Sequence, residues 1–156
     1  MRAPAKEAGP LSSGGGPFRT GIVAIVGPPN VGKSTLLNLF LGHRLSIVTP
    51  KPQTTRHRIR GVLTGEKYQA AFLDTPGLLE RPRDILDRRL VQVAQEAVEE
   101  ADLVVLLVEP APPREIEKGL VERLRALGRP AILAINKIDL VPRGSLLPVM
   151  EEYSRL

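Results

Sequence analysis

Hydrophobic residues along the chain follow two patterns. Short runs of consecutive apolar residues, typical of buried strands, occupy residues 21–26, 103–108 and 131–135. Longer segments with apolar residues near a 3.6-residue period, typical of helices that pack on a sheet, occupy residues 35–41, 85–100 and 114–127. Because these segments alternate, the sequence predicts a three-layer α/β domain with a mostly parallel sheet.

One part of the chain departs from this alternation. Residues 57–64 alternate polar and apolar side chains, as a half-exposed edge strand does, and residues 65–67 form a turn into an apolar segment at 68–73. We expect these two segments to pair antiparallel, with the first at the edge of the sheet. Residues 103–108 are the most apolar of the strands, so we expect them at its centre.

Length and composition fit one soluble cytoplasmic domain. The chain has 156 residues, of which 42% are hydrophobic, and it contains no cysteine, which excludes disulfides and thiolate metal sites. A formal net charge of +5 suits a polyanionic ligand or partner. Residues 1–17 are rich in Pro, Gly, Ala and Ser and predict a flexible N-terminal tail before a domain at 18–156. A role for Arg2 and Lys6 on RNA or a membrane surface is the alternative.

The strongest motif lies between the first predicted strand and the first predicted helix. It reads Gly-Pro-Pro-Asn-Val-Gly-Lys-Ser and matches the phosphate-binding pattern G-x-x-x-x-G-K-[ST]. Glycine lets successive backbone N–H groups converge on phosphate oxygens, Lys33 reaches the β- and γ-phosphates, and the Ser34 hydroxyl ligates Mg²⁺. The candidate nucleotide-binding residues here are Gly27, Pro28, Pro29, Asn30, Val31, Gly32, Lys33, Ser34 and Thr35.

A second group of candidates follows the strand at 68–73, where the chain reads Asp74, Thr75, Pro76, Gly77 and Leu78. A carboxylate at the tip of a buried strand is placed to hold the outer shell of Mg²⁺, and the backbone N–H of Gly77 can approach a γ-phosphate.

The long polar loop before the edge strand contains Thr54 and Thr55. Either hydroxyl could ligate Mg²⁺, with a slight preference for Thr55, and a loop whose threonines have no role is an equal alternative. The predicted metal ligands are therefore Ser34, Thr55 and Asp74.

The last motif, Asn136-Lys137-Ile138-Asp139, follows the strand at 131–135. The Asp139 carboxylate can accept hydrogen bonds from the N1–H and 2-amino groups of guanine, whereas adenine offers no such donor pair. Asn136 can brace the neighbouring loops while the stem of Lys137 lies over the base. This motif favours GTP over ATP and disfavours an ATP-dependent phosphotransferase.

The order of these motifs resembles that of the translation-factor-related GTPases, and among them the bacterial Era GTPases. The resemblance covers residues 21–139 and includes a first switch, Pro-Gln-Thr-Thr-Arg-His-Arg-Ile, at residues 52–59. Its most diagnostic part is the Gln-Thr-Thr-Arg-His-Arg segment at 53–58. It implies GTP hydrolysis to GDP coupled to assembly of the small (30S) ribosomal subunit, with 16S rRNA held mainly by a C-terminal KH domain.

By this resemblance the sequence stops before the last base-binding loop, the closing strand and helix, and the KH domain. The resemblance also leaves open peripheral association with the inner face of the cell membrane, and it gives no reason to expect DNA as a partner.

The resemblance also suggests a mechanism in which Lys33, Thr55, Gly77 and Asn30 are the catalytic candidates. Leu78 stands where many signalling GTPases carry a glutamine that orients the attacking water, so intrinsic hydrolysis should be slow. We hypothesise that Asn30 helps to hold K⁺ beside the phosphates. The alternatives are a nucleotide-gated RNA- or protein-binding module with negligible hydrolysis, and the G domain of a related ribosome-assembly GTPase.

Overall fold

The computed structural model of the protein describes residues 17–42, 59–73, 75–79 and 84–156. Three predictions lie outside these residues: residues 1–16 of the tail predicted at 1–17, the first-switch threonines Thr54 and Thr55, and the metal candidate Asp74.

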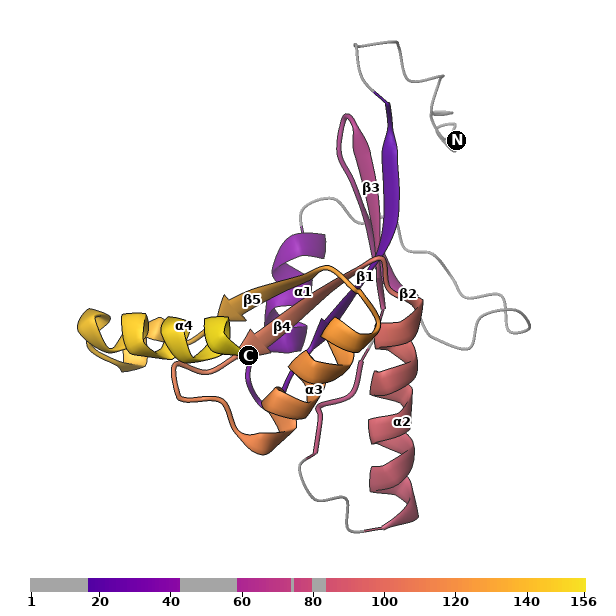
Figure 1. Ribbon diagram of the computed structural model, residues 1–156. Coiled ribbons are helices and arrows are strands. Elements are labelled where there is room, and N and C mark those ends of the chain that lie inside the picture. Colours follow the sequence, from indigo (N-terminus) through magenta and orange to yellow (C-terminus); the bar gives the residue numbers. More distant parts are fainter. Residues whose placement is uncertain (1–16, 43–58, 74, 80–83) are drawn as a thin grey trace, which may run out of the picture.

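A five-stranded sheet forms the middle of the fold (Figure 1). Its strands are β1 (Arg19–Val26), β2 (Ile59–Thr64), β3 (Tyr68–Leu73), β4 (Leu103–Val108) and β5 (Ala131–Ile135). The strand order is β2-β3-β1-β4-β5, and only the β2–β3 pair is antiparallel. The predicted mostly parallel sheet with an antiparallel edge strand is therefore confirmed. The middle position belongs to β1, and the more apolar β4 lies beside it.

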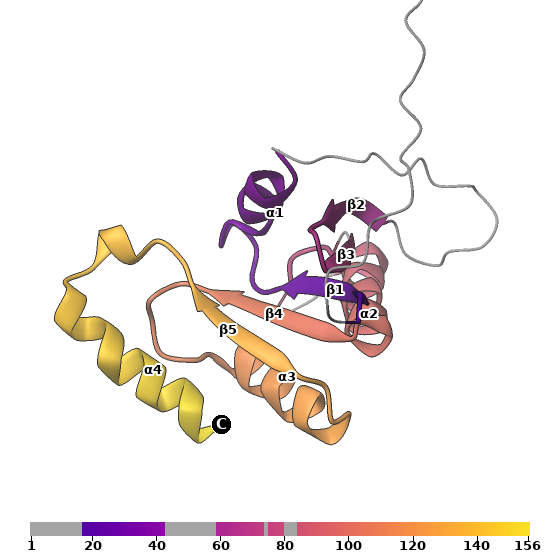
Figure 2. The ribbon, with the colours of Figure 1, turned by 90° about the horizontal axis from the view of Figure 1, so that it is seen from above.

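Helices cover both faces of the sheet, as Figure 2 shows. They are α1 (Lys33–Leu41), α2 (Ile85–Glu100), α3 (Glu115–Ala126) and α4 (Leu146–Arg155), with short 3₁₀ turns η1 (Ile138–Leu140) and η2 (Arg143–Ser145). The predicted α/β class and its three layers are confirmed. The η1, η2 and α4 elements were not anticipated from the sequence.

Alternate residues of the strands pack in two separate clusters of the hydrophobic core, one on each face of the sheet. Val23 and Ile25 of β1 pack with the α1 side chains Leu37 and Leu41. Their neighbours Ala24 and Val26 face the opposite side, with the buried side chains of α2 and α3. Because successive strand residues point to opposite faces, β1 is buried on both sides and its carboxyl end is held rigidly between the helical layers.

The helix ends follow local rules that the sequence contains. Asp84 caps α2 by accepting a hydrogen bond from the backbone N–H of Asp87 at 2.8 Å. After α3, Gly128 adopts a left-handed φ of +61°, as glycine often does directly after a helix. Gly42 after α1 has a φ of −62°, a conformation open to any residue.

Candidate functional site

The loop between β1 and α1 has the conformation that its two glycines allow. Gly27 has a φ of +151° and Gly32 a φ of +104°, both in the region that side chains disfavour. A Cβ added to Gly27 would lie 2.0 Å from the carbonyl oxygen of Leu107, and one on Gly32 would lie 2.4 Å from Nδ2 of Asn136. Both positions therefore require glycine, for backbone conformation and for space.

Lys33, the first residue of α1, places its charge inside this loop. Its Nζ donates hydrogen bonds to the carbonyl oxygens of Pro28 at 2.6 Å and Gly27 at 3.0 Å. Burial lowers the pKa of the Lys33 ammonium from its ordinary value. The ammonium and the N-terminus of α1 together concentrate positive potential at the loop, which favours an anion.

A cavity of about 550 Å³ opens over this loop. Its lining comes from two segments, and the residues are Pro29, Asn30, Gly32, Lys33, Ser34 and Thr35 together with Thr75, Pro76 and Gly77. The structure therefore brings the predicted phosphate loop and the predicted second switch to one place.

Two hydrogen bonds hold the second segment against β1 and the loop. The N–H of Leu78 donates to the carbonyl oxygen of Gly27 at 3.0 Å, and the hydroxyl of Thr75 donates to the carbonyl oxygen of Ile25. A Cβ on Gly77 would lie 2.9 Å from Cα of Pro29, so only glycine permits this approach. Movement of residues 75–78 must therefore displace the phosphate loop, and the reverse.

The side chain of Leu78 faces away from the cavity. It is 6% exposed and packs in the core cluster that contains Leu73 and Ala94. Leu78 thus meets the loop through its backbone, while its side chain anchors the segment in the core. A side chain in that place cannot orient a water at the phosphates, which agrees with the chemistry expected of leucine.

The base motif is tied to the phosphate loop by one side chain. The backbone N–H of Asn136 donates to the carbonyl oxygen of Val108 at 2.8 Å, which continues the pairing of β4 and β5. Its side-chain Nδ2 donates to the carbonyl oxygen of Val31, also at 2.8 Å. The predicted bracing role of Asn136 therefore corresponds to a direct contact between residues 105 positions apart.

The rest of the motif lies at the rim. Lys137 has a φ of +56°, which is uncommon for a residue with a side chain, and its Nζ pairs with the carboxylate of Glu109 at 2.6 Å. Ile138 and Asp139 begin the exposed turn η1. Sequence reasoning missed Glu109, although its place directly after β4, next to the strand that precedes Lys137, is a signal that could have found it.

Of the predicted metal ligands, the described residues include only Ser34. Its side chain lies in the first turn of α1, is exposed, and lines the cavity beside Lys33. A hydroxyl in this place suits a hard cation such as Mg²⁺.

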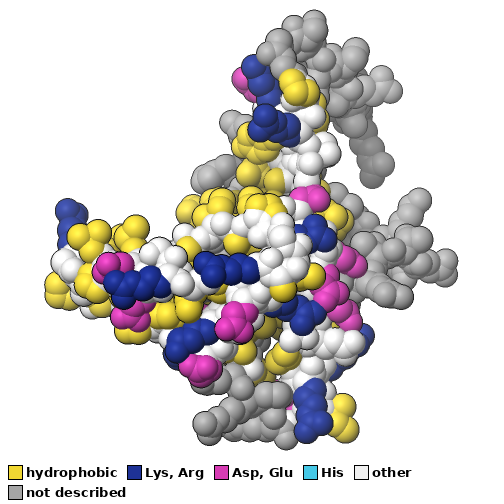
Figure 3. All heavy atoms as spheres, viewed as in Figure 1, with side chains coloured by type: hydrophobic (Ala, Val, Ile, Leu, Met, Phe, Trp, Pro, Cys, Tyr) yellow, Lys and Arg dark blue, Asp and Glu magenta, His cyan; other side chains and the backbone are white. Residues whose placement is uncertain are grey.

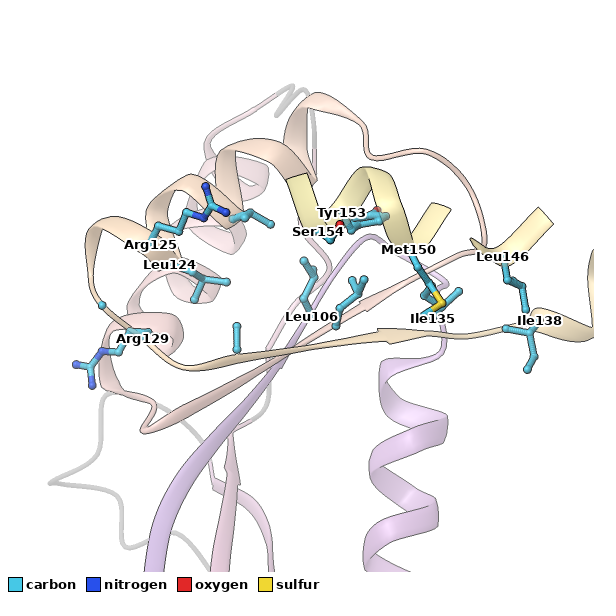
Figure 4. Close-up of a pocket in the computed structure, with 14 residues that line it drawn as sticks. Leu106, Leu124, Arg125, Arg129, Ile135, Ile138, Leu146, Met150, Tyr153 and Ser154 are labelled. Carbon is cyan, nitrogen blue, oxygen red and sulfur yellow. The ribbon is translucent and has the colours of Figure 1, made fainter. Parts of the chain in front are cut away.

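A larger cavity, of about 660 Å³, lies away from the loop, between β5, α3 and α4 (Figure 4). Figure 4 shows Leu106 and Ile135 on its floor, Met150 and Tyr153 reaching toward it from α4, and Arg125 and Arg129 at its far end. Its lining is mostly aliphatic. The polar cavity over the loop is the better candidate for an anionic ligand.

A strand is followed by a glycine-bounded loop and a helix, and Asn136 joins that loop to the motif that follows β5. This arrangement defines a P-loop nucleotide-binding domain. Residues 22–137 match the protein family described as "50S ribosome-binding GTPase". The chain therefore belongs to this family of GTPases. No helix in the described part of the chain is long and apolar enough to cross a membrane.

Within the family, the relatives named Era confirm the resemblance found in the motifs. GTPase Era of Geobacter sp. (strain M21) is 48% identical over 137 residues, which are 87% of this chain and 46% of the relative. A crystal structure of a variant of Aquifex aeolicus Era bound to GDP·AlF4⁻ has a TM-score of 0.71 at 40% identity, over 88% of this chain and 48% of that one.

Another crystal structure, of Era with MgGDPNP and nucleotides 1506–1542 of 16S ribosomal RNA, has the same TM-score and identity, over 88% of this chain and 47% of the other. This chain thus spans about half the length of the Era proteins that it matches.

Proposed function

We propose that this protein binds GTP with Mg²⁺ and hydrolyses it slowly to GDP and phosphate, as a switch protein of the Era type. The observation that carries the proposal is the hydrogen bond from Asn136 to Val31. It connects the predicted base motif to the phosphate loop, which supports a site in which a nucleotide with its phosphates on the loop has its base near Asp139. A polyphosphate site alone would serve ATP equally well, whereas the carboxylate at Asp139 favours guanine.

Different residues are proposed to bind the phosphates and the metal ion. The loop amides from Gly27 to Ser34 and the ammonium of Lys33 stabilise negative charge on the β- and γ-phosphates. Lys33 is already inside the loop, so phosphate oxygens would replace the carbonyl oxygens that it now contacts. Ser34, Thr55 and Asp74 are the proposed groups for Mg²⁺, which when bound neutralises charge on the β- and γ-oxygens.

Nucleotide state would be read by the second switch. The backbone N–H of Gly77 is proposed to meet the γ-phosphate, and the Leu78 N–H bond to the carbonyl of Gly27 couples that contact to the loop. Loss of the γ-phosphate would remove its contact with the Gly77 N–H and leave only the bond between Leu78 and Gly27.

The burial of Leu78 supports slow turnover, because a buried leucine cannot orient the attacking water as the glutamine of many signalling GTPases does. Asn30 is exposed at the cavity, with a left-handed φ of +61°. We propose it as the residue that helps to hold K⁺ beside the phosphates. Turnover compared in K⁺ and Na⁺ at equal ionic strength tests this role, and equal rates would remove it.

The cellular role proposed for the longer protein is binding of 16S rRNA during assembly of the 30S subunit. Its support is the family and the RNA-bound Era structure. On the face seen in Figure 3, Lys and Arg side chains are interspersed with Asp and Glu, which agrees with RNA being held mainly by another domain. A cytoplasmic location is part of the proposal, and cosedimentation with anionic vesicles tests peripheral attachment to the membrane.

The domain division is also a proposal: a tail at residues 1–17 and a G domain that occupies 18–156 and continues in the longer protein. Limited proteolysis of the protein, with fragments identified by mass, tests the boundary at residue 18.

Calorimetric titration with Mg²⁺ present tests nucleotide binding directly. We expect GDP and GTP to bind and ADP and ATP to bind at least about 100-fold more weakly, because Asp139 loses two charge-assisted hydrogen bonds with adenine. Equal affinities for the guanine and adenine nucleotides would overturn the proposal. Phosphate release measured with and without 16S rRNA then separates a hydrolysing switch from a binding module with negligible turnover.

A further inference from the structure

The ion pair between Glu109 and Lys137 joins the ends of two neighbouring parallel strands. Val108 and Ile135 are paired in the sheet, and Glu109 follows the first of them directly. The Oε1 atom of Glu109 lies 2.6 Å from Nζ of Lys137. Glu109 belongs to no recognised nucleotide-binding motif of the sequence, yet it contacts the middle of one.

The backbone on both sides of this ion pair is fixed. The carbonyl oxygen of Glu109 accepts a hydrogen bond from the N–H of Ala111 at 2.8 Å, and Lys137 accepts one from the N–H of Leu140 at 3.1 Å. The left-handed φ of Lys137 is maintained by these contacts and by the bonds of Asn136. The remaining freedom of Lys137 lies in its side chain, whose entropy is among the largest of any residue.

Two carboxylates are candidates to pair with the Lys137 ammonium: Glu109, at the end of the neighbouring strand β4, and Asp139. Asp139 stands two residues further on, at the exposed start of η1. An ammonium that turned to Asp139 would occupy the oxygen atoms needed to accept the N1–H and 2-amino groups of guanine. The structure shows Nζ on the Glu109 side instead.

We infer that Glu109 is a positioning residue for guanine recognition. Its carboxylate holds the Lys137 ammonium beside the end of β4, which keeps the lysine stem in place along the base and leaves Asp139 free to read guanine. The inference rests on the proposed function, and it adds a specificity-determining residue from outside the four motifs.

The test is a set of GDP titrations with Glu109→Gln, which keeps size and removes charge. Glu109 is 52% and Lys137 33% exposed in their side chains, so the effect is modest, and we expect GDP to bind about 2- to 5-fold more weakly. Inorganic tripolyphosphate, which has no base, should bind both proteins equally. In 1 M NaCl, where the Debye length is about 3 Å, the difference for GDP should shrink.

Two further variants separate positioning from a general effect on the fold. In a Lys137→Met background, Glu109→Gln should change GDP affinity by less than about 1.5-fold, because the ammonium that it positions is gone. Glu115→Gln is the matched control, since Glu115 forms a comparable exposed pair with Lys118 at 2.8 Å on α3. It should leave GDP affinity unchanged.

Each outcome has a defined meaning. Equal GDP affinity of the unchanged protein and Glu109→Gln would overturn the inference and leave the proposed function intact. A loss that persists in the Lys137→Met background, or that extends to tripolyphosphate, would also overturn it. Failure of the unchanged protein to prefer GDP over ADP would overturn the proposed function, and the inference with it.

Discussion

Replacing Gly32 with alanine tests the link between the phosphate loop and the base motif. Gly32 has a φ of +104°, and an added Cβ would lie 2.4 Å from Nδ2 of Asn136. That nitrogen donates the 2.8 Å hydrogen bond to the carbonyl of Val31. Because the new methyl group and the amide cannot share this space, Gly32→Ala must displace the Asn136 side chain as well as strain the loop.

The expected loss has two parts. A residue with a side chain in this backbone conformation costs about 1–3 kcal/mol, and the lost hydrogen bond contributes about 0.5–1.5 kcal/mol. The free energy of unfolding without nucleotide should therefore fall by about 1.5–4.5 kcal/mol, measured by urea denaturation. Gly119→Ala in α3 is the control, because a Cβ there meets nothing within 4 Å and alanine should stabilise the helix by about 0.5–1 kcal/mol.

A double-mutant cycle with Asn136→Ala isolates the shared contact. Asn136→Ala removes the same hydrogen bond, so the double variant should lose about 0.5–1.5 kcal/mol less than the sum of the two single variants. Full stability of Gly32→Ala, or strict additivity of the two changes, would refute the view that one side chain connects the two segments.

Three other changes have defined outcomes. Asp139→Asn should weaken GDP binding by about 3–6 kcal/mol, or about 10²–10⁴-fold. It should favour xanthosine diphosphate, because the C2 carbonyl of xanthine can accept a hydrogen bond from the new amide, and calorimetry with both nucleotides checks this. Leu124→Ala, at a side chain 3% exposed, should lower the free energy of unfolding by about 2–5 kcal/mol, whereas Leu127→Ala, at one 41% exposed, should cost less than about 1 kcal/mol; urea denaturation compares them. Burial, together with the charge of Glu117, raises the pKa of Tyr153 to about 12. The unfolded chain therefore loses this proton at lower pH than the native protein, and the free energy of unfolding falls as the pH rises above 10. Tyr153→Phe should remove about 1 kcal/mol of the loss between pH 9 and 11, and an identical alkaline profile in the two proteins would contradict this assignment.

The sequence by itself determined the local features of the site. The glycines at 27 and 32 fit a backbone that other residues adopt only with strain, and the apolar runs and helical periods around them predicted the elements that support the loop. The family followed from the order of four short motifs, because each motif can be recognised from a few neighbouring residues. Asn136 was assigned a bracing role on the same grounds.

Only the tertiary structure decided which distant residues meet. Burial periodicity shows that β1 and β4 are both interior strands, but sheet order depends on crossover connections, and these placed β1 in the middle. Three contacts depend on packing between segments that are distant in the sequence, so no local pattern predicts them. They are the burial of Leu78, the hydrogen bond from Asn136 to Val31, and the pairing of Glu109 with Lys137. The residues that a given backbone conformation requires can be identified from the local sequence. Which side chains meet across the sheet depends on the order in which its strands pair.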